Sequence, residues 1–208
     1  RPYIANNIAM TRQGFALDRV DERPFPAQEV LNPADIAENE ITINNIRLWD
    51  QSPIKDVYNQ IQVIRLYYDF LGVDIDRYSI GGETRQVMLS ARELAPEKLP
   101  DEAQRWINLS LLYTHGYGLA VSPVNEFSSE GRPELLVQDI PPKTIDAAAS
   151  LKVTRPEIYY GEEKDGYVIV NSKTKEFDYP TEKDTPAYAS YQGTGGVTVG
   201  SLLRRAAY

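Results

Sequence analysis

The sequence has no cysteine, one histidine and no long apolar segment among its 208 residues. Without cysteine there is no disulfide, no thiolate nucleophile and no cysteine-ligated zinc or iron–sulfur site. The single histidine, His115, excludes metal sites that need two imidazole ligands. The longest apolar run is Tyr167–Val170, far short of the about 20 residues that a membrane-spanning helix requires. This chain is therefore not expected to cross a membrane itself.

Positive charge is also scarce. Lysine and arginine total 22 residues against 30 aspartates and glutamates, which gives a formal net charge of −8 at pH 7. Nonspecific nucleic-acid binding needs a basic surface, and lysine and arginine drive adhesion to anionic lipid, so neither partner is expected. The hydrophobic share of 42% and the charged share of 25% are typical of an ordinary globular protein.

Apolar residues recur at helical spacing in several segments. The spacing predicts helices over residues 1–15, 54–71 and 101–115. The second is the strongest, because Ser52 can cap its start and Gly72 can end it. Shorter helical segments are predicted at 32–33, 143–150 and 201–208.

The best hairpin signal follows the second helix. Residues 73–80 and 83–94 lie on either side of Gly81-Gly82, a pair that supplies the positive φ angles of a tight turn. In the second strand, residues 87, 89 and 91 alternate with 88, 90 and 92, as in a strand buried on one face. Further extended segments are predicted over 41–43, 134–140, 157–160, 167–171 and 175–179.

Mixed helices and antiparallel hairpins, without regular βαβ alternation, predict an α+β fold. We expect one soluble domain over residues 1–208, with a flexible loop over 181–196. The chain begins at Arg1 rather than methionine and stops inside the helix predicted over 201–208. It is therefore expected to be a piece of a longer protein.

Several segments resemble one known family in collinear order over nearly the whole chain. The most specific are Tyr113-Thr-His-Gly-Tyr-Gly118 and Arg155-Pro-Glu-Ile-Tyr-Tyr-Gly-Glu162. The others include Thr42–Asp50, Arg85–Leu94, Tyr167–Asn171 and Glu176–Pro180. Together they resemble the bacterial membrane proteins of uncharacterised protein family UPF0182.

The resemblance implies a location rather than a reaction. It implies a protein with several N-terminal transmembrane helices followed by a large soluble region outside the cytoplasmic membrane. This chain resembles the start of that soluble region. Its implied partners are the transmembrane part and the C-terminal remainder of its own chain, with a homo-oligomer as a further option. The resemblance implies no catalytic residues, and no cofactor is expected.

His115 is the first candidate for chemistry. Ser122, Asn125 and Glu126 follow it closely, so a Ser–His–acid arrangement with His115 and Glu126 as catalytic residues is conceivable. No Gly-x-Ser-x-Gly turn accompanies it. The competing interpretation, which the sequence favours, is a structural histidine that bonds to carbonyls at the end of a helix.

Asp74 and Asp76 are the candidate metal ligands. Two residues apart on a predicted strand, they point to one face and could share a hard cation such as Ca²⁺. A solvated face with Arg77 or Arg85 as partner is the simpler interpretation, and the sequence favours it.

Tyrosine is frequent, with 14 residues. Exposed tyrosines suit binding of sugars or peptides, because they offer a large contact area at low entropic cost. The candidate ligand-binding residues are Tyr113, Tyr117, Asn125 and Tyr160. In the pair Tyr159-Tyr160, one ring is expected near the core and the other near the surface.

These observations predict a non-catalytic domain that binds or scaffolds within the cell envelope. The alternative is a segment of a hydrolase-like enzyme that processes an envelope polymer with carboxylates and His115. In a third interpretation, a site forms only when the rest of the chain docks.

Overall fold

The computed structural model describes residues 2–25, 31–162, 166–181, 183, 185–201 and 204. The chain divides into two compact units, residues 1–40 and 41–208. Helices and antiparallel sheets are both present, so the predicted α+β class is confirmed. Within the described ranges, no helix has the length and apolar character needed to cross a membrane.

The first unit contains short helices. They are α1 (Pro2–Gly14), the 3₁₀ helix η1 (Leu17–Arg19) and α2 (Pro33–Glu38). The predicted helix over 1–15 is thus confirmed from Pro2 onward. The predicted turn at Asn32 is also confirmed, because its Oδ1 accepts the backbone N–H groups of Ala34 and Asp35 and caps α2.

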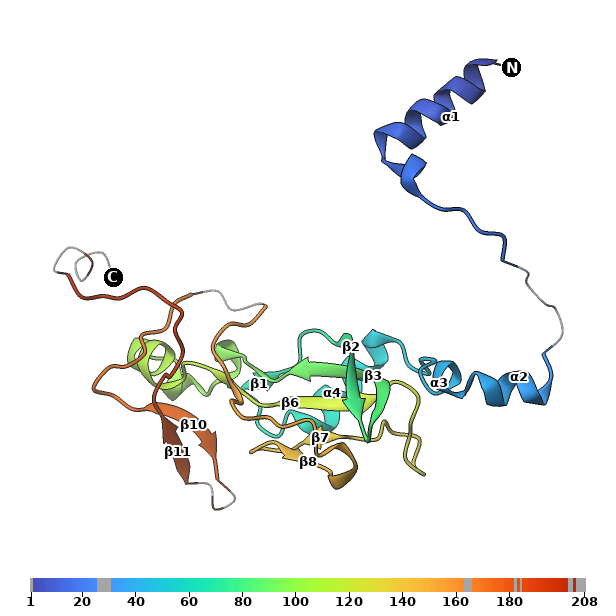
Figure 1. The fold of residues 1–208 in the computed structure, drawn as a ribbon. Helices are drawn as coiled ribbons and strands as arrows, with labels where there is room; N and C mark the ends of the chain where they lie inside the picture. The colour runs from blue at the N-terminus through green and yellow to red at the C-terminus, as the bar shows by residue number, and fades with distance from the viewer. Residues whose placement is uncertain are drawn as a thin grey trace. The chain divides into compact units, whose positions relative to one another are not determined.

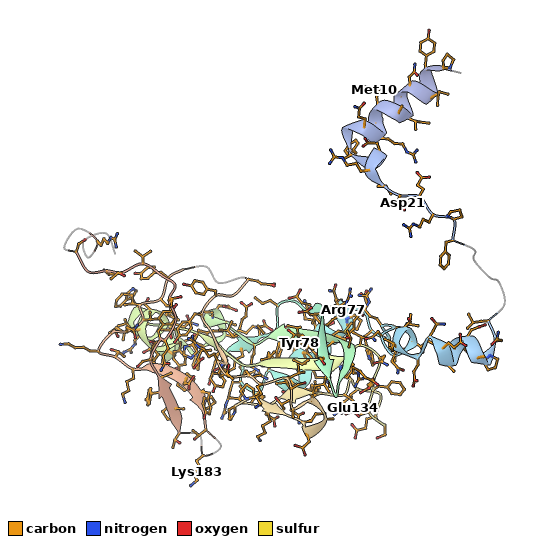
Figure 2. The ribbon with its side chains drawn as sticks, viewed as in Figure 1. Met10, Asp21, Arg77, Tyr78, Glu134 and Lys183 are labelled. Atoms are coloured by element: carbon orange, nitrogen blue, oxygen red, sulfur yellow. The ribbon has the colours of Figure 1, made fainter. Side chains whose placement is uncertain are left out.

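A five-stranded antiparallel sheet forms the centre of the second unit, in the order β2–β3–β6–β7–β8 (Figure 1). The strands are β2 (Asp74–Ile80), β3 (Glu83–Ala91), β6 (Leu119–Pro123), β7 (Val137–Gln138) and β8 (Lys143–Thr144). Gly81 and Gly82 adopt φ angles of 63° and 89°, so the predicted hairpin and its turn are confirmed. Arg77 and Tyr78 belong to β2, one of the two edge strands (Figure 2).

Both faces of this sheet carry apolar cores. On one face Ile54 and Tyr58 of α4 (Gln51–Gln62) pack with Met88. On the other, Val87 and Val121 pack in a cluster that includes Ala148 of the 3₁₀ helix η5 (Asp146–Ala148). The prediction that β3 is buried on one face is therefore wrong, because separate elements cover its two sides.

The helix predicted over 54–71 is shorter than expected. It starts at Gln51, where Asp50 rather than Ser52 caps it, and it ends at Gln62. Ile64 adopts a φ angle of 63°, which a right-handed helix cannot contain. The chain then leaves to form β1 (Tyr68–Asp69), which pairs with β4 (Glu93–Leu94).

Other predictions of helices and extended segments also need correction. The extended segment predicted at 41–43 is wrong, because Glu40–Ile43 forms the short helix α3. The helix predicted over 101–115 is divided into the 3₁₀ helix η3 (Asp101–Ala103) and the π-helix η4 (Asn108–Leu112). The 3₁₀ helix η2 (Pro96–Lys98) precedes them. The segment 143–150 contains β8 and η5, and the helix predicted over 201–208 falls largely outside the described residues.

Two small sheets complete the second unit. One pairs β5 (Gly116–Tyr117) with β9 (Glu157–Ile158), and the other pairs β10 (Glu176–Pro180) with β11 (Pro186–Ala189). Strand β11 lies inside the segment 181–196 that was expected to be a loop, and Lys183 lies in the turn before it (Figure 2). The strand predicted over 167–171 is absent from these described residues, where the Ile169 N–H donates to the carbonyl of Ser110 instead.

Candidate ligand-binding site

The two most specific sequence blocks lie side by side. In the β5–β9 pair, Gly116 is opposite Ile158 and Tyr117 is opposite Glu157. Gly116 is needed there because a Cβ atom would lie 2.3 Å from the carbonyl oxygen of Arg92. The backbone of one block therefore fixes the position of the other, and the side chains that flank β5 and β9 meet.

His115 lies just before this pairing and is fully buried, with 0% of its side chain exposed. Its Nδ1 lies 2.9 Å from the hydroxyl oxygen of Thr114, and its Nε2 lies 3.3 Å from Asp178 Oδ1 on β10. Its ring packs at 4.7 Å from that of Tyr159, with an interplanar angle of 35°. The partners of His115 are thus side chains rather than the helix-end carbonyls that we predicted.

The hydrogen-bond directions define how His115 is held. The single hydroxyl proton of Thr114 is donated to Glu176 Oε2 at 2.8 Å, so Thr114 accepts from the Nδ1–H of His115. A carboxylate can only accept, so the 3.3 Å contact between Nε2 and Asp178 Oδ1 is a hydrogen bond when Nε2 carries a proton. Both ring nitrogens therefore face protein side chains.

Glu176 is the centre of the cluster. Its Oε2 accepts from the hydroxyls of Thr114 and Tyr159, both at 2.8 Å. Its Oε1 accepts from the backbone N–H groups of Tyr191 at 3.0 Å and Asn171 at 3.4 Å. These donors come from four separate segments, so one buried carboxylate joins the region around β5, β9 and β10. Each charge-assisted bond of this kind contributes about 1.5–3 kcal/mol.

A pocket of about 270 Å³ opens directly beside this cluster. Its walls include four tyrosine rings, two valines and several glycines. The lining residues that carry the argument are Tyr159, Tyr160, Tyr167, Val168, Val170 and Tyr191. None of its described lining side chains is charged. We call this the tyrosine pocket.

Ring contacts and a hydrogen bond hold the tyrosine side chains that form the walls of the pocket. The ring of Tyr159 also packs edge-on against that of Tyr191, with centroids 4.7 Å apart. Burial, followed by the hydrogen bond to Glu176, raises the pKa of the Tyr159 phenol, so this hydroxyl remains a donor at neutral pH. Tyr160 is 74% exposed at the rim, which confirms that the pair Tyr159-Tyr160 presents one ring inward and one outward.

The predicted ligand-binding residues are not all brought together. Tyr160 lines the tyrosine pocket, whereas Tyr117 is buried and stacks on Tyr179 at 4.7 Å. Tyr113 packs against Phe177 at 5.1 Å, and Asn125 lies beyond the end of β6. Only Tyr160 of the four is among the described pocket residues.

The predicted catalytic and metal residues are also separate from one another. Glu126 forms an ion pair with Arg85, and no hydrogen bond joins it to His115 in the described part of the chain. Asp74 and Asp76 are exposed on β2, where Asp76 Oδ1 accepts the backbone N–H of Arg77. Across the described ranges, no group of three or more histidine, aspartate or glutamate side chains is placed to hold a metal ion.

Sequence reasoning missed most of the residues that build the pocket. Glu176 and Asp178 received no role, although both lie in the Glu176–Pro180 block of the resemblance. Tyr167 lies in another such block, and Tyr191 lies in the segment that we expected to be a loop. Membership of those blocks was the available signal for Glu176, Asp178 and Tyr167, whereas nothing in the local pattern singled out Tyr191.

Comparison with known proteins identifies the family. The model of the uncharacterised protein family UPF0182 matches residues 1–208. UPF0182 proteins of Desulforamulus reducens and Pelotomaculum thermopropionicum are 52% and 51% identical over 98% and 99% of this chain. A UPF0182 protein of Trichodesmium erythraeum is 48% identical over all 208 residues of this chain. The chain spans 22% of the length of each of these relatives.

No solved structure matches this chain significantly. The family match covers every residue and agrees with the resemblance carried by the sequence blocks around the tyrosine pocket. The chain therefore belongs to the uncharacterised protein family UPF0182.

Proposed function

We propose that this chain is a ligand-binding domain that a longer membrane protein holds outside the cytoplasmic membrane, and that the tyrosine pocket is its binding site. The observation that carries the proposal is the tyrosine pocket itself, whose wall is fixed by the buried Glu176. Concave sites with aromatic walls and a few oriented polar groups are typical of ligand pockets. The partners of the domain are then the transmembrane part and the remainder of its own chain, with homo-oligomerisation as an option.

The outer location is supported by the family resemblance and by composition. The resemblance implies that several transmembrane helices precede this region, and this chain is 22% of the length of its relatives. The absence of cysteine suits an oxidising compartment.

Single cysteines test the location. In a full-length protein otherwise free of cysteine, Lys183→Cys places a thiol in the turn between β10 and β11 (Figure 2). A membrane-impermeant maleimide added to intact cells is expected to label it. Ala120→Cys, at a position with no exposure, is the matched control and should be labelled only after denaturation. Labelling of Lys183→Cys only after lysis would place the domain on the cytoplasmic side.

A filled pocket tests the binding role. Val168→Phe adds a ring inside the tyrosine pocket, and Val197→Phe makes the same change at an exposed position outside its lining. Thermal unfolding of the full-length protein in lipid nanodiscs is followed with methyl β-glucopyranoside, choline or a blocked tetraalanine peptide. A ligand at about 100 times its Kd stabilises the folded state by about 2.7 kcal/mol. We expect one probe to stabilise the parent and Val197→Phe but not Val168→Phe, and no stabilisation by any probe contradicts the proposal.

Hydrolysis of an envelope polymer is the second candidate function. The observation in its favour is the 3.3 Å contact between His115 Nε2 and Asp178, whose side chain keeps 15% exposure. The complete burial of the His115 side chain favours binding over catalysis. The test is turnover of any probe that binds: cleavage that is lost in His115→Gln, with binding retained, would support the enzyme.

A further inference from the structure

We propose that a second cavity, on the face of the five-stranded sheet that α4 does not cover, binds an amphiphile with one acyl chain and an anionic head group. This inference concerns a site separate from the tyrosine pocket and goes beyond the proposed function. It follows from the apolar floor of the cavity, from its narrow form, and from the lysine and the arginine at its rim. Every lining residue lies within 31–162, a range that the structure describes without a gap.

A segment that crosses this face of the sheet forms one wall of the cavity. At its start, the hydroxyl of Ser150 donates to the carbonyl of Ser79 on the edge strand β2 at 2.8 Å. At its other end, the N–H of Gly118, just before β6, donates to the carbonyl of Pro156 at 2.7 Å. Residues 150–156, which we call the cover segment, are therefore fixed to the sheet at both ends.

Apolar side chains line the space between the sheet and the cover segment. The pairing register places Leu89, Val121 and Val137 side by side in a row across β3, β6 and β7. Leu151 and Val153 of the cover segment pack against the same apolar cluster but remain partly exposed. Both sets of side chains line a cavity of about 430 Å³. Moving the apolar part of a ligand from water into this cavity is therefore favourable.

The cavity is long and narrow. In the register of the sheet, Tyr78 lies opposite Arg85 of β3, and Leu119 lies opposite Ala91 of the same strand. The lining residues Tyr78 and Leu119 are thus separated by six positions of β3, which is about 20 Å in an extended strand. A volume of about 430 Å³ over that length suits one extended acyl chain better than a ring system or a lipid with two chains.

An apolar peptide is a less favourable occupant of this cavity. Each of its buried backbone N–H and C=O groups needs a hydrogen-bond partner, because burying such a group without one is costly. Strands β3 and β6 of the floor already pair with a neighbour on both sides, so their backbone groups are used within the sheet. An acyl chain has no such groups and therefore fits a floor of leucine and valine side chains.

Two cations at the rim select the charge of the head group. Lys152 and Arg155 are exposed lining residues of the cover segment, and neither forms an ion pair with another residue in the described part of the chain. Arg155 lies next to the anchor at Gly118. At the other end of the cavity, burial and then the carboxylate of Asp76 raise the pKa of the Tyr78 phenol. A carboxylate or phosphate head group is therefore expected at Lys152 and Arg155, with the chain directed toward Tyr78.

Photo-crosslinking tests the position of the ligand directly. The full-length protein in lipid nanodiscs is irradiated with dodecanoate that carries a diazirine on its chain, and the modified peptides are identified by mass spectrometry. We expect attachment within residues 119–121 or 150–155, reduced by an excess of plain dodecanoate or dodecyl phosphate and less by dodecanol. The stronger of the two anionic competitors identifies the head group. Absence of attachment at these residues, or competition by dodecanol as strong as that by both anions, overturns the proposal.

A filled cavity tests the position of the acyl chain. Val153→Phe adds a ring to the cavity lining and should abolish the attachment. Val197→Phe makes the same change at an exposed position outside the lining and is the matched control. Thermal unfolding shows whether each variant is folded. Undiminished attachment in folded Val153→Phe contradicts binding in this cavity.

Substitutions at exposed positions test the head group without a risk to folding. Lys152→Gln combined with Arg155→Gln should weaken competition by the anionic competitors about tenfold and leave competition by dodecanol unchanged. Lys173→Gln combined with Lys175→Gln removes the same charge from exposed positions outside the lining and should change neither. Equal effects of the two double variants would mean that only the overall charge of the chain matters, and this result overturns the assignment of an anionic head group to the rim.

Discussion

The hydroxyl of Tyr159 donates a 2.8 Å hydrogen bond to Oε2 of Glu176, and through it the wall of the tyrosine pocket is tied to the buried cluster around His115. The two residues are 17 positions apart in the chain: Tyr159 follows the end of β9, and Glu176 begins β10. This bond gives the buried cluster a role that does not require catalysis: it orients a ring that lines the tyrosine pocket.

The first prediction concerns the charge of Glu176. Glu176→Gln retains the shape of the side chain but turns one acceptor oxygen into an NH₂ group that faces two donors. We expect a loss of about 2–4 kcal/mol in the free energy of unfolding, measured by urea denaturation, because buried donors then lack acceptors. Glu130→Gln, which affects an exposed ion pair with Arg132, should change stability by less than about 0.5 kcal/mol. Equal effects of the two substitutions would contradict the central role of Glu176.

Two buried tyrosines allow a second prediction. The hydroxyl of Tyr58 lies 2.6 Å from Ser122 Oγ and donates to the carbonyl of Met88 at 3.1 Å. The hydroxyl of Tyr68 is also buried but has no partner among the described residues. Tyr58→Phe should therefore cost about 1–2 kcal/mol, whereas Tyr68→Phe should be neutral or stabilising. Thermal denaturation of the two variants checks the order, and a larger loss for Tyr68→Phe would show that its hydroxyl is satisfied in solution.

Local features of the fold were predictable because their causes are local. The Gly81-Gly82 turn follows from the positive φ angles that glycine allows, and the start of α2 follows from the side chain of Asn32. The helix predicted over 54–71 shows the limit. Its apolar stripe continues past Gln62, but Ile64 turns the chain so that Tyr68 can pair with Leu94, a contact that no helical pattern encodes.

The site was predictable only in part, because its contacts are distant in sequence. Thr114 and Glu176 are 62 positions apart, and His115 and Asp178 are 63 apart. Tyr160 could be selected because an adjacent tyrosine pair places one ring outward. The partners of His115 could not be selected in this way, because the sequence does not distinguish Asp178 from the many other carboxylates of the chain.

The third prediction is a loss of stability in alkaline solution. Burial raises the pKa of four tyrosine phenols above the value of about 10 in an unfolded chain. They are Tyr58, Tyr68, Tyr117 and Tyr159. The folded state keeps these protons while the unfolded state releases them, so stability is fully present below about pH 10 and falls as the pH rises above it. The pKa of Arg92, lowered by burial to about 10, acts in the opposite direction but is one group against four.

The measurement is the urea midpoint at about pH 9 and about pH 10.5. Tyr68→Phe removes one titrating phenol without removing a hydrogen bond, so its midpoint should fall less than that of the parent between the two values. A parent midpoint that does not change with pH would contradict the burial of these phenols.

The fourth prediction compares two glycines with nearly equal backbone conformation. Gly118 and Gly131 adopt φ angles of 77° and 75°. A Cβ atom at Gly118 would lie 2.8 Å from Pro142 Cγ and 2.9 Å from Arg92 Nη1, whereas nothing lies within 4 Å at Gly131. Gly131→Ala should cost the backbone strain alone, about 1–2 kcal/mol, and Gly118→Ala should cost clearly more. Similar losses in thermal denaturation would mean that the segment around Pro142 moves freely away.

The last prediction concerns Arg92, which is fully buried and bonds to backbone carbonyls rather than to a carboxylate. Its Nε donates to the Gln62 carbonyl at 2.7 Å and its Nη1 to the Tyr117 carbonyl at 2.9 Å. Its guanidinium carbon also lies 5.2 Å from the ring centre of Phe70. One planar group thus joins the end of α4 to β5, next to His115.

Arg92→Lys keeps the charge but removes the fork that reaches both carbonyls. A lysine ammonium cannot satisfy these directions together and is more strongly hydrated, so the cost of its burial is less well compensated. We expect a loss of about 3–5 kcal/mol in urea denaturation, with increased hydrogen exchange at β5. Arg132→Lys, at an exposed ion pair, is the matched control and should change stability by less than about 0.5 kcal/mol. If Arg92→Lys is as stable as this control, the charge of Arg92 rather than its geometry holds α4 and β5 together.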